Sequence, residues 1–415
     1  MISLKHQDTI LNLFWKSLHV LGKQGITFVS FILCANLLSP HEFGVYNYVF
    51  SIILVLILFG DFGISSATAK FVAEYQVTDQ DLLKRVPFNA LLILLATTSI
   101  AALILLVFGG QLLGENFHYV LYILPIIFFA PLTAVFDGIY MGLSRFKELA
   151  IISFFTGIST VLILYIAITS FGLVGALATQ TFFYLALSIL LMIRFGKFSL
   201  RYDGFLIRTI GHYSLIIGVA VIGFILFTRV DAIFLGYYGY IQEVGYFEII
   251  NKILIISMLP FGIVAQVIAP VITKYYSQNN ITQVLSKFKR YLLFSVLASS
   301  VLTLIIFVSK DLIISRFFAE YYNDNLMWMF TLLLIAHFTQ MITGVFSVGF
   351  VTATGHARFT MHFLLFFGIL HLLLNFVLIE LFGYMGIIYS VIITKVIADV
   401  SYLLIYYLLL HKQVK

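Results

Sequence analysis

The chain has 415 residues, of which 62% are hydrophobic and only 10% are charged, and its mean hydropathy is +1.08. No soluble fold can hide this much apolar surface, so the composition excludes a water-soluble protein and indicates a polytopic membrane protein. The net charge of +6 calls for no nucleic-acid partner, because basic loops on one side of a membrane account for it.

Twelve apolar stretches, each close to the ~20 residues that cross a bilayer, follow one another along the chain. The expected helices of the first half cover residues 17–38, 45–65, 86–108, 117–143, 149–170 and 172–193. Those of the second half cover residues 212–235, 244–271, 290–308, 325–350, 359–381 and 386–410. We therefore expect an all-α fold of twelve transmembrane helices. No cleavable signal precedes the first of them, which we expect to be retained as an anchor.

Lysine and arginine are distributed unevenly between the two sides of this arrangement. Seventeen fall on the side of the chain termini, and only Lys310 and Arg316 fall on the other side. Cytoplasmic loops carry such an excess of basic residues. We therefore expect a multi-pass membrane protein with both termini in the cytoplasm.

Three short segments recur in the same order in the two halves. EFGVY at residues 42–46 returns as EVGYF at 243–247, GLSRF at 142–146 as GHARF at 355–359, and FGLVG at 171–175 as FGYMG at 382–386. Such repetition predicts two six-helix bundles, residues 1–200 and 201–415. An even number of helices in each bundle keeps the copies parallel, so we expect a pseudo-two-fold axis along the membrane normal and a transport path between the bundles.

Five basic residues lie inside or at the rim of apolar stretches, namely Lys16, Lys23, Arg229, Lys252 and Lys395. A charge in hydrocarbon costs about 2.5 kcal/mol or more, so such residues persist where they line a water-filled cavity, pair or snorkel. Lys16 and Lys23 share one face of the first helix, where they are candidates to bind an anion at the cytoplasmic mouth. The alternative is that both side chains extend to the membrane interface. We expect Lys23, Arg229, Lys252 and Lys395 to line a cavity that accepts an anion.

Asp231 stands two positions after Arg229 in the seventh predicted helix. On a regular helix these two side chains point in nearly opposite directions. Both can face the cavity only if the helix is distorted, and otherwise Asp231 packs against a neighbour in its own half.

Two acid–base pairs in the second half have the i,i+4 spacing that favours ion pairing, Glu248 with Lys252 and Lys395 with Asp399. Pairing lowers the cost of burying the charges, and a coupled pair at this depth can also carry a proton. Asp231, Glu248 and Asp399 are therefore the candidates for ion coupling.

Several segments resemble the bacterial polysaccharide flippases. LSPHEFGVY at residues 38–46, GDFGI at 60–64 and KF at 70–71 resemble their first hairpin, and RVD at 229–231, LG at 235–236 and VGY at 244–246 resemble their seventh and eighth helices. This is the O-antigen or Wzx-type family of the multidrug/oligosaccharidyl-lipid/polysaccharide exporter superfamily. The resemblance covers essentially the whole chain, although the related lipid II flippases are longer, with fourteen helices.

The resemblance implies translocation of undecaprenyl-pyrophosphate-linked oligosaccharides from the cytoplasmic to the periplasmic leaflet. It implies membrane lipids as further partners, with a polysaccharide polymerase and a chain-length regulator as candidates from the same pathway. Two alternatives stay open. They are an ion-coupled multidrug antiporter of the same superfamily, and a membrane glycosyltransferase or polymerase.

The residues favour a transporter over an enzyme. The largest loop expected on the periplasmic side, residues 310–324, is short for a catalytic domain, and no P-loop motif is present. The single cysteine, Cys34, excludes an internal disulfide and a thiolate metal site. His337, His362 and His371 have no metal-ligand spacing and are assigned to packing. We expect no enzymatic activity, no cofactor and no metal.

Overall fold

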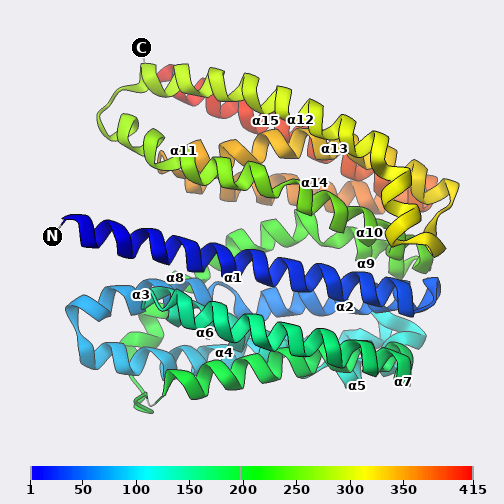
Figure 1. The fold of residues 1–415 in the computed structure, drawn as a ribbon, viewed down its shortest axis with the longest axis horizontal. Helices are drawn as coiled ribbons and strands as arrows, with labels where there is room; N and C mark the ends of the chain where they lie inside the picture. The colour runs from blue at the N-terminus through cyan, green and yellow to red at the C-terminus, as the bar shows by residue number, and fades with distance from the viewer. Residues whose placement is uncertain (1, 197, 414–415) are drawn as a thin grey trace. The chain divides into compact units, whose positions relative to one another are not determined.

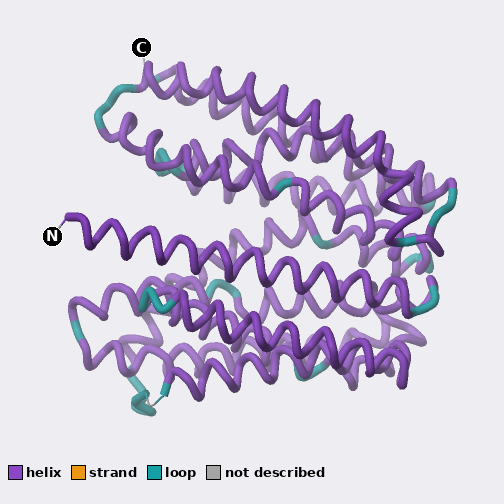
Figure 2. Tube along the Cα trace, viewed as in Figure 1, coloured by secondary structure: helices purple, strands orange, loops and turns teal. Residues whose placement is uncertain are grey.

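The computed structural model describes residues 2–196 and 198–413, apart from the side chains of residues 2–14, 16, 17 and 21. These described residues form helices and no strands, which confirms the all-α prediction (Figure 1, Figure 2). Their contacts divide the chain into two compact units, Met1–Ile222 and Gly223–Lys415.

Unit 1 is built from long helices and short connectors. They are α1 (Ile2–Leu37), α2 (Pro40–Asp61), α3 (Ile64–Thr78), α4 (Gln80–Leu113), η1 (Gly114–Tyr119), α5 (Val120–Ile123), α6 (Ile126–Gly142), α7 (Phe146–Phe195) and the first part of α8 (Gly204–Thr228). The main packing partners are α1 with α7, α3 with α6, and α2 with α4 (Figure 1). Leu206 and Ile210 of α8 are fully buried in the apolar core of this unit. The boundary between the two units therefore lies after residue 222, whereas the predicted boundary between the two bundles lies after residue 200.

Unit 2 contains the rest of α8 and the helices that follow it. They are α9 (Val230–Tyr237), α10 (Ile241–Ser257), α11 (Leu259–Ser277), α12 (Ile281–Phe317), η2 (Ala319–Tyr321), α13 (Asp324–Phe346), the π-helix η3 (Ser347–Thr352), α14 (Ala357–Phe382) and α15 (Tyr384–Lys412). Here α15 packs against both α13 and α14, and α12 packs against α13. Phe288, Phe346 and Phe350 form the aromatic centre of the apolar core.

Ten helical segments of the described chain are long and apolar enough to cross a membrane. One of them, Phe146–Phe195, has non-helical backbone angles at Gly172 and is therefore two helices joined end to end. The shorter α6 is apolar as well. With this division, and with α6 included, the described residues provide twelve crossing segments, the predicted number.

The breaks at Gly172 and Gly383 reveal the internal repeat in the backbone itself. Gly172 has φ 53° and ψ −133°, and Gly383 has φ 60° and ψ −146°. A side chain disfavours positive φ, so glycine is needed at both positions. Three residues later, a Cβ on Gly175 or on Gly386 would lie 2.0 Å from a backbone carbonyl oxygen of the preceding helix. The same close turn therefore joins the last two helices of each half.

A second shared turn corrects one of the sequence alignments. Ser144 (φ 57°) and Gly355 (φ 78°) are both left-handed, and each is followed by an N–H that bonds the carbonyl five residues back. The donors are Arg145, at 2.8 Å, and His356, at 3.0 Å. The structure thus pairs Gly355 with Ser144 rather than with Gly142. This spacing of 211 positions (355 − 144) equals that between Gly172 and Gly383.

Candidate functional site

The seventh crossing segment is broken at Arg229, beside a group of charged residues of unit 2. α8 ends at Thr228, α9 begins at Val230, and Arg229 between them has φ −125° and ψ −13°. The Arg229 N–H still bonds the Ile225 carbonyl at 2.9 Å, so the chain bends without separating. This is the distortion that allows Arg229 and Asp231 to reach the same cavity.

That cavity lies within unit 2 and has a volume of about 430 Å³. Its wall includes the six charged candidates predicted within apolar helices of the second half: Arg229, Asp231, Glu248, Lys252, Lys395 and Asp399. They come from α9 and the residue before it, from α10 and from α15. Residues of α13, η3 and α14 complete the wall, among them His337, Gln340 and Ser347.

Asp231 is held inside the unit by α14. Its Oδ1 lies 2.7 Å from His371 Nε2 and accepts a hydrogen bond from Asn375 Nδ2 at 2.9 Å. The other ring nitrogen of His371 contacts Thr394 Oγ1 on α15 at 2.7 Å. Asp231, His371, Asn375 and Thr394 are all buried, so this polar network crosses three elements without reaching solvent. Asp231 thus lines the cavity and also packs against a neighbour in its own half.

Asp399 is also bonded to the protein, through Thr339 Oγ1 of α13 at 2.8 Å. Lys395, one turn before Asp399, is electrostatically attracted to both Asp231 and Asp399. All three residues line the cavity. The described residues contain no direct ion pair between Lys395 and Asp399, so the predicted pair is not observed.

Arg229, Glu248 and Lys252 also line the cavity. Glu248 attracts both cations. The Arg229 guanidinium lies 5.9 Å from the Phe224 ring centre, and its buried Nε has no hydrogen-bond partner in the described part of the chain. No carboxylate among the described residues forms an ion pair with Arg229. Its planar set of donors is therefore available to an anion in the cavity.

The basic residues predicted in the first helix belong to unit 1. Lys23 Nζ lies 3.5 Å from Asp137 Oδ2 of α6, and Asp137 Oδ1 is buried without a hydrogen-bond partner in the described chain. Asp137 thus pairs with α1, a helix of its own unit. The side chain of Lys16 lies outside the described residues.

The hydrogen-bond partners of Asp231, His371 and Asn375, were not predicted from the sequence. His371 is buried, as expected of a packing residue, but both of its ring nitrogens make polar contacts. The signal was the i,i+4 spacing of His371 and Asn375, which places two polar side chains on one face of an otherwise apolar helix. His337 was likewise assigned to packing, and it lines the cavity with its Nε2 2.6 Å from Ser257 Oγ.

Comparison with known proteins gives both sequence and fold relatives. A family model described as polysaccharide biosynthesis protein matches residues 10–276. An uncharacterized membrane protein of Methanocaldococcus jannaschii is 23% identical over 407 residues, covering 91% of this chain and 92% of its own length.

Two solved structures share the fold over most of their length. The lipid II flippase MurJ, in an inward closed conformation, has a TM-score of 0.75 at 14% identity and covers 94% of this chain and 87% of its own. A multidrug resistance MATE family transporter of the MOP superfamily, in an inward-facing conformation, has a TM-score of 0.73 at 14% identity, with coverages of 94% and 96%. At these identities the likeness shows a common fold.

Proposed function

Because the chain belongs to the polysaccharide biosynthesis protein family, we propose that it moves undecaprenyl-pyrophosphate-linked polysaccharide repeat units across the bacterial inner membrane. The direction is from the cytoplasmic to the periplasmic leaflet, with both chain termini in the cytoplasm. The protein acts as a transporter and not as an enzyme. Its partners are the lipid-linked oligosaccharide and the membrane lipids, together with a polymerase and a chain-length regulator that use the product.

The observation that carries this proposal is the set of three cations, Arg229, Lys252 and Lys395, on the wall of one cavity. Three carboxylates line the same wall, so the formal charges balance. Asp231 and Asp399, however, already accept hydrogen bonds from the protein, whereas Arg229 forms no ion pair within the described chain. A pyrophosphate that enters therefore meets the donors of the Arg229 guanidinium, which no carboxylate of the described chain pairs with. Such donors offset its loss of hydration in a low-dielectric site.

The two-unit organisation supports a transport step by alternating access. The pyrophosphate and sugars cross through a path lined by Lys23, Arg229, Lys252 and Lys395, while the polyprenyl tail stays in the bilayer. Rocking of one bundle against the other alternates access to the two sides. Lys16 and Lys23 serve the cytoplasmic mouth. Asp231, Glu248 and Asp399 are the residues through which an ion gradient drives the cycle.

The multidrug antiporter is the alternative that the fold supports equally well, because MATE transporters and MurJ match this chain with similar scores. A cationic drug needs an unsatisfied carboxylate in the cavity, and among the described residues Glu248 is the lining acid without a hydrogen bond from the protein. A glycosyltransferase or polymerase is disfavoured, because the connector between α12 and α13 contains only residues 318–323.

The test is glycan display in a strain that lacks the gene. Arg229→Ala is expected to abolish surface polysaccharide at unchanged membrane abundance, and Arg229→Lys to restore it only in part, because lysine lacks the planar fork. Arg316 lies at the end of α12 and outside the cavity, so Arg316→Ala is the matched control. This variant is expected to display polysaccharide normally.

Normal display by the triple variant Lys23→Ala, Arg229→Ala and Lys252→Ala would refute the anionic path. Loss of drug export by Glu248→Gln, with polysaccharide display intact, would favour the antiporter.

A further inference from the structure

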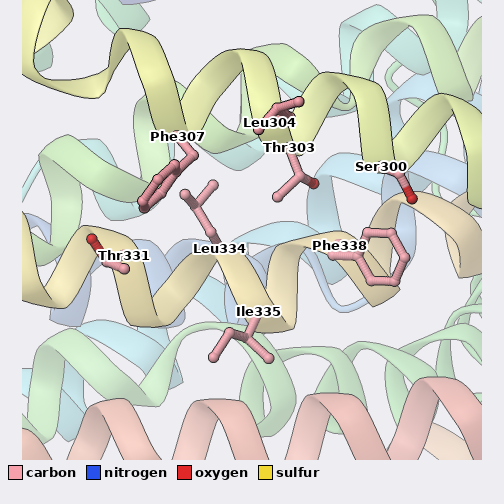
Figure 3. A pocket seen from close by; sticks show the side chains of 8 residues that line it. All are labelled: Ser300, Thr303, Leu304, Phe307, Thr331, Leu334, Ile335 and Phe338. Carbon is pink, nitrogen blue, oxygen red and sulfur yellow. The ribbon is translucent and has the colours of Figure 1, made fainter.

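A groove runs between α12 and α13 on the surface of unit 2, away from the charged cavity. It has a volume of about 480 Å³. Each helix contributes four lining residues at the same spacing of i, i+3, i+4 and i+7: Ser300, Thr303, Leu304 and Phe307 from α12, and Thr331, Leu334, Ile335 and Phe338 from α13. In Figure 3, Leu334 of α13 is directed toward Phe307 of α12 across the space between the helices, whereas Ile335 is drawn on the other side of α13.

The surroundings of the groove indicate that it opens toward lipid. α12 is one of the candidate membrane spans, and only 17% of its apolar window is buried inside the protein. Leu304 in the groove is 62% exposed, and Val308 beside it is 72% exposed. In a bilayer such side chains contact hydrocarbon. The natural occupant of an apolar groove on this face is therefore a hydrocarbon chain.

One end of the groove carries a cation. Lys310 lies three residues after Phe307, so it continues the row of α12 residues that line the groove. Its Nζ donates a hydrogen bond to Thr331 Oγ1 and lies 4.6 Å from the Phe307 ring centre, and both of these partners line the groove. The adjacent Asp311 accepts a hydrogen bond from Tyr322 at 3.0 Å and forms no ion pair with Lys310 in the described chain.

The depth of Lys310 matches the level of lipid phosphates. Arg290 and Lys310 on α12 are twenty positions apart, or roughly 30 Å, which equals the thickness of the hydrocarbon core. In the predicted topology Arg290 lies on the cytoplasmic side, where the basic residues gather. Lys310 then lies at the level of the headgroups of the opposite leaflet. From Lys310 back to Ser300 the groove extends ~15 Å, about the depth of one leaflet.

We propose that this groove binds one acyl chain of an anionic phospholipid, whose phosphate contacts Lys310. The length of the groove favours a phospholipid of one leaflet, because the groove ends at half the depth of the bilayer. A longer polyprenyl chain would leave most of its length outside the groove. The charge of Lys310 selects an anionic headgroup. The bound lipid bridges α12 and α13 and stands apart from the proposed substrate path.

The experiment uses the full chain purified in detergent and native mass spectrometry during titration with phosphatidylglycerol or phosphatidylethanolamine. The wild-type protein is expected to bind phosphatidylglycerol in preference. Lys310→Gln is expected to weaken that binding about fivefold, the equivalent of ~1 kcal/mol for one basic residue at a membrane surface. Lys310→Arg is expected to retain it, because the charge stays. Ile335→Trp, which fills the groove, is expected to lower the number of bound lipids.

Arg316→Gln removes a nearby cation of the same helix that does not line the groove, and it is expected to bind like the wild type. Wild-type affinity in Lys310→Gln would overturn the proposal, as would equal affinities for the two lipids. An equal loss in Arg316→Gln would assign the effect to general surface charge and would overturn it too. Size-exclusion profiles establish that each variant is folded before it is titrated.

Discussion

Removing His371 tests how the buried Asp231 is held in the membrane-spanning core. His371→Leu deletes the ring nitrogen that lies 2.7 Å from Asp231 Oδ1 and leaves Asn375, at 2.9 Å, as the neighbouring donor. Asp231 is only 1% exposed, so water cannot replace the lost partner. We expect this single variant to be less stable than the double variant Asp231→Asn and His371→Leu, in which no carboxylate remains to be satisfied.

The loss of stability in His371→Leu distinguishes an ordinary hydrogen bond to Asp231 from a partner that a buried charge requires. An ordinary hydrogen bond between membrane helices contributes ~0.6 kcal/mol, whereas leaving a buried charge without its partner costs ~3–5 kcal/mol. Because Asn375 and the attraction of Lys395 remain, we expect the lower end of the second range, ~3 kcal/mol, for His371→Leu. The double variant should recover most of this loss, which gives a large coupling energy between the two positions.

The assay is denaturant or thermal unfolding of the purified protein in detergent, with all four members of the double-mutant cycle measured in parallel. His362→Leu is the matched control, because this histidine lies on the same helix but is exposed and bonds only to the Arg358 carbonyl. Additive losses in the cycle, or a loss in His371→Leu no larger than in the control, would refute the interpretation of Asp231 as a buried charge with a required partner.

Two further predictions concern the fold. Gly383→Ala should lower the unfolding free energy by about 1–2 kcal/mol because its φ is positive. Gly110→Ala, on a helix with open space around it, should not, and equal losses would contradict the role given to the turn. Reporter fusions after the last residue and within residues 111–117 should report opposite sides of the membrane, as the distribution of basic residues requires. The same side for both would contradict twelve crossings.

Much of the fold was predictable, because hydropathy identifies segments that must satisfy their backbone internally. The crossing segments and the turn at Gly172 and Gly383 follow from the sequence. The turn at Ser144 was misaligned by two residues, since serine and glycine share a left-handed conformation there that no letter pattern reveals. The 50-residue run of α7 also depends on backbone angles, because only the unusual φ and ψ of Gly172 divide it.

The site was predictable in its charges but not in its contacts. Ionisable residues in apolar helices mark candidate internal sites, and three of the residues chosen on this ground, Arg229, Asp231 and Lys395, line one cavity. Their partners depend on how three elements pack. Helical spacing also placed Arg229 and Asp231 on opposite faces, and the break at Arg229, which contains neither proline nor glycine, was not visible in the sequence.

The junction at Gly383 has a consequence for how the protein is made. A single residue separates the end of α14 at Phe382 from the start of α15 at Tyr384, and Gly172 divides α7 in the same way. No hydrophilic connector lies between such helices, so the second helix has no linker that would hold it in water while the first enters the bilayer. We therefore expect each couple to insert as one hairpin, after both of its helices have left the ribosome.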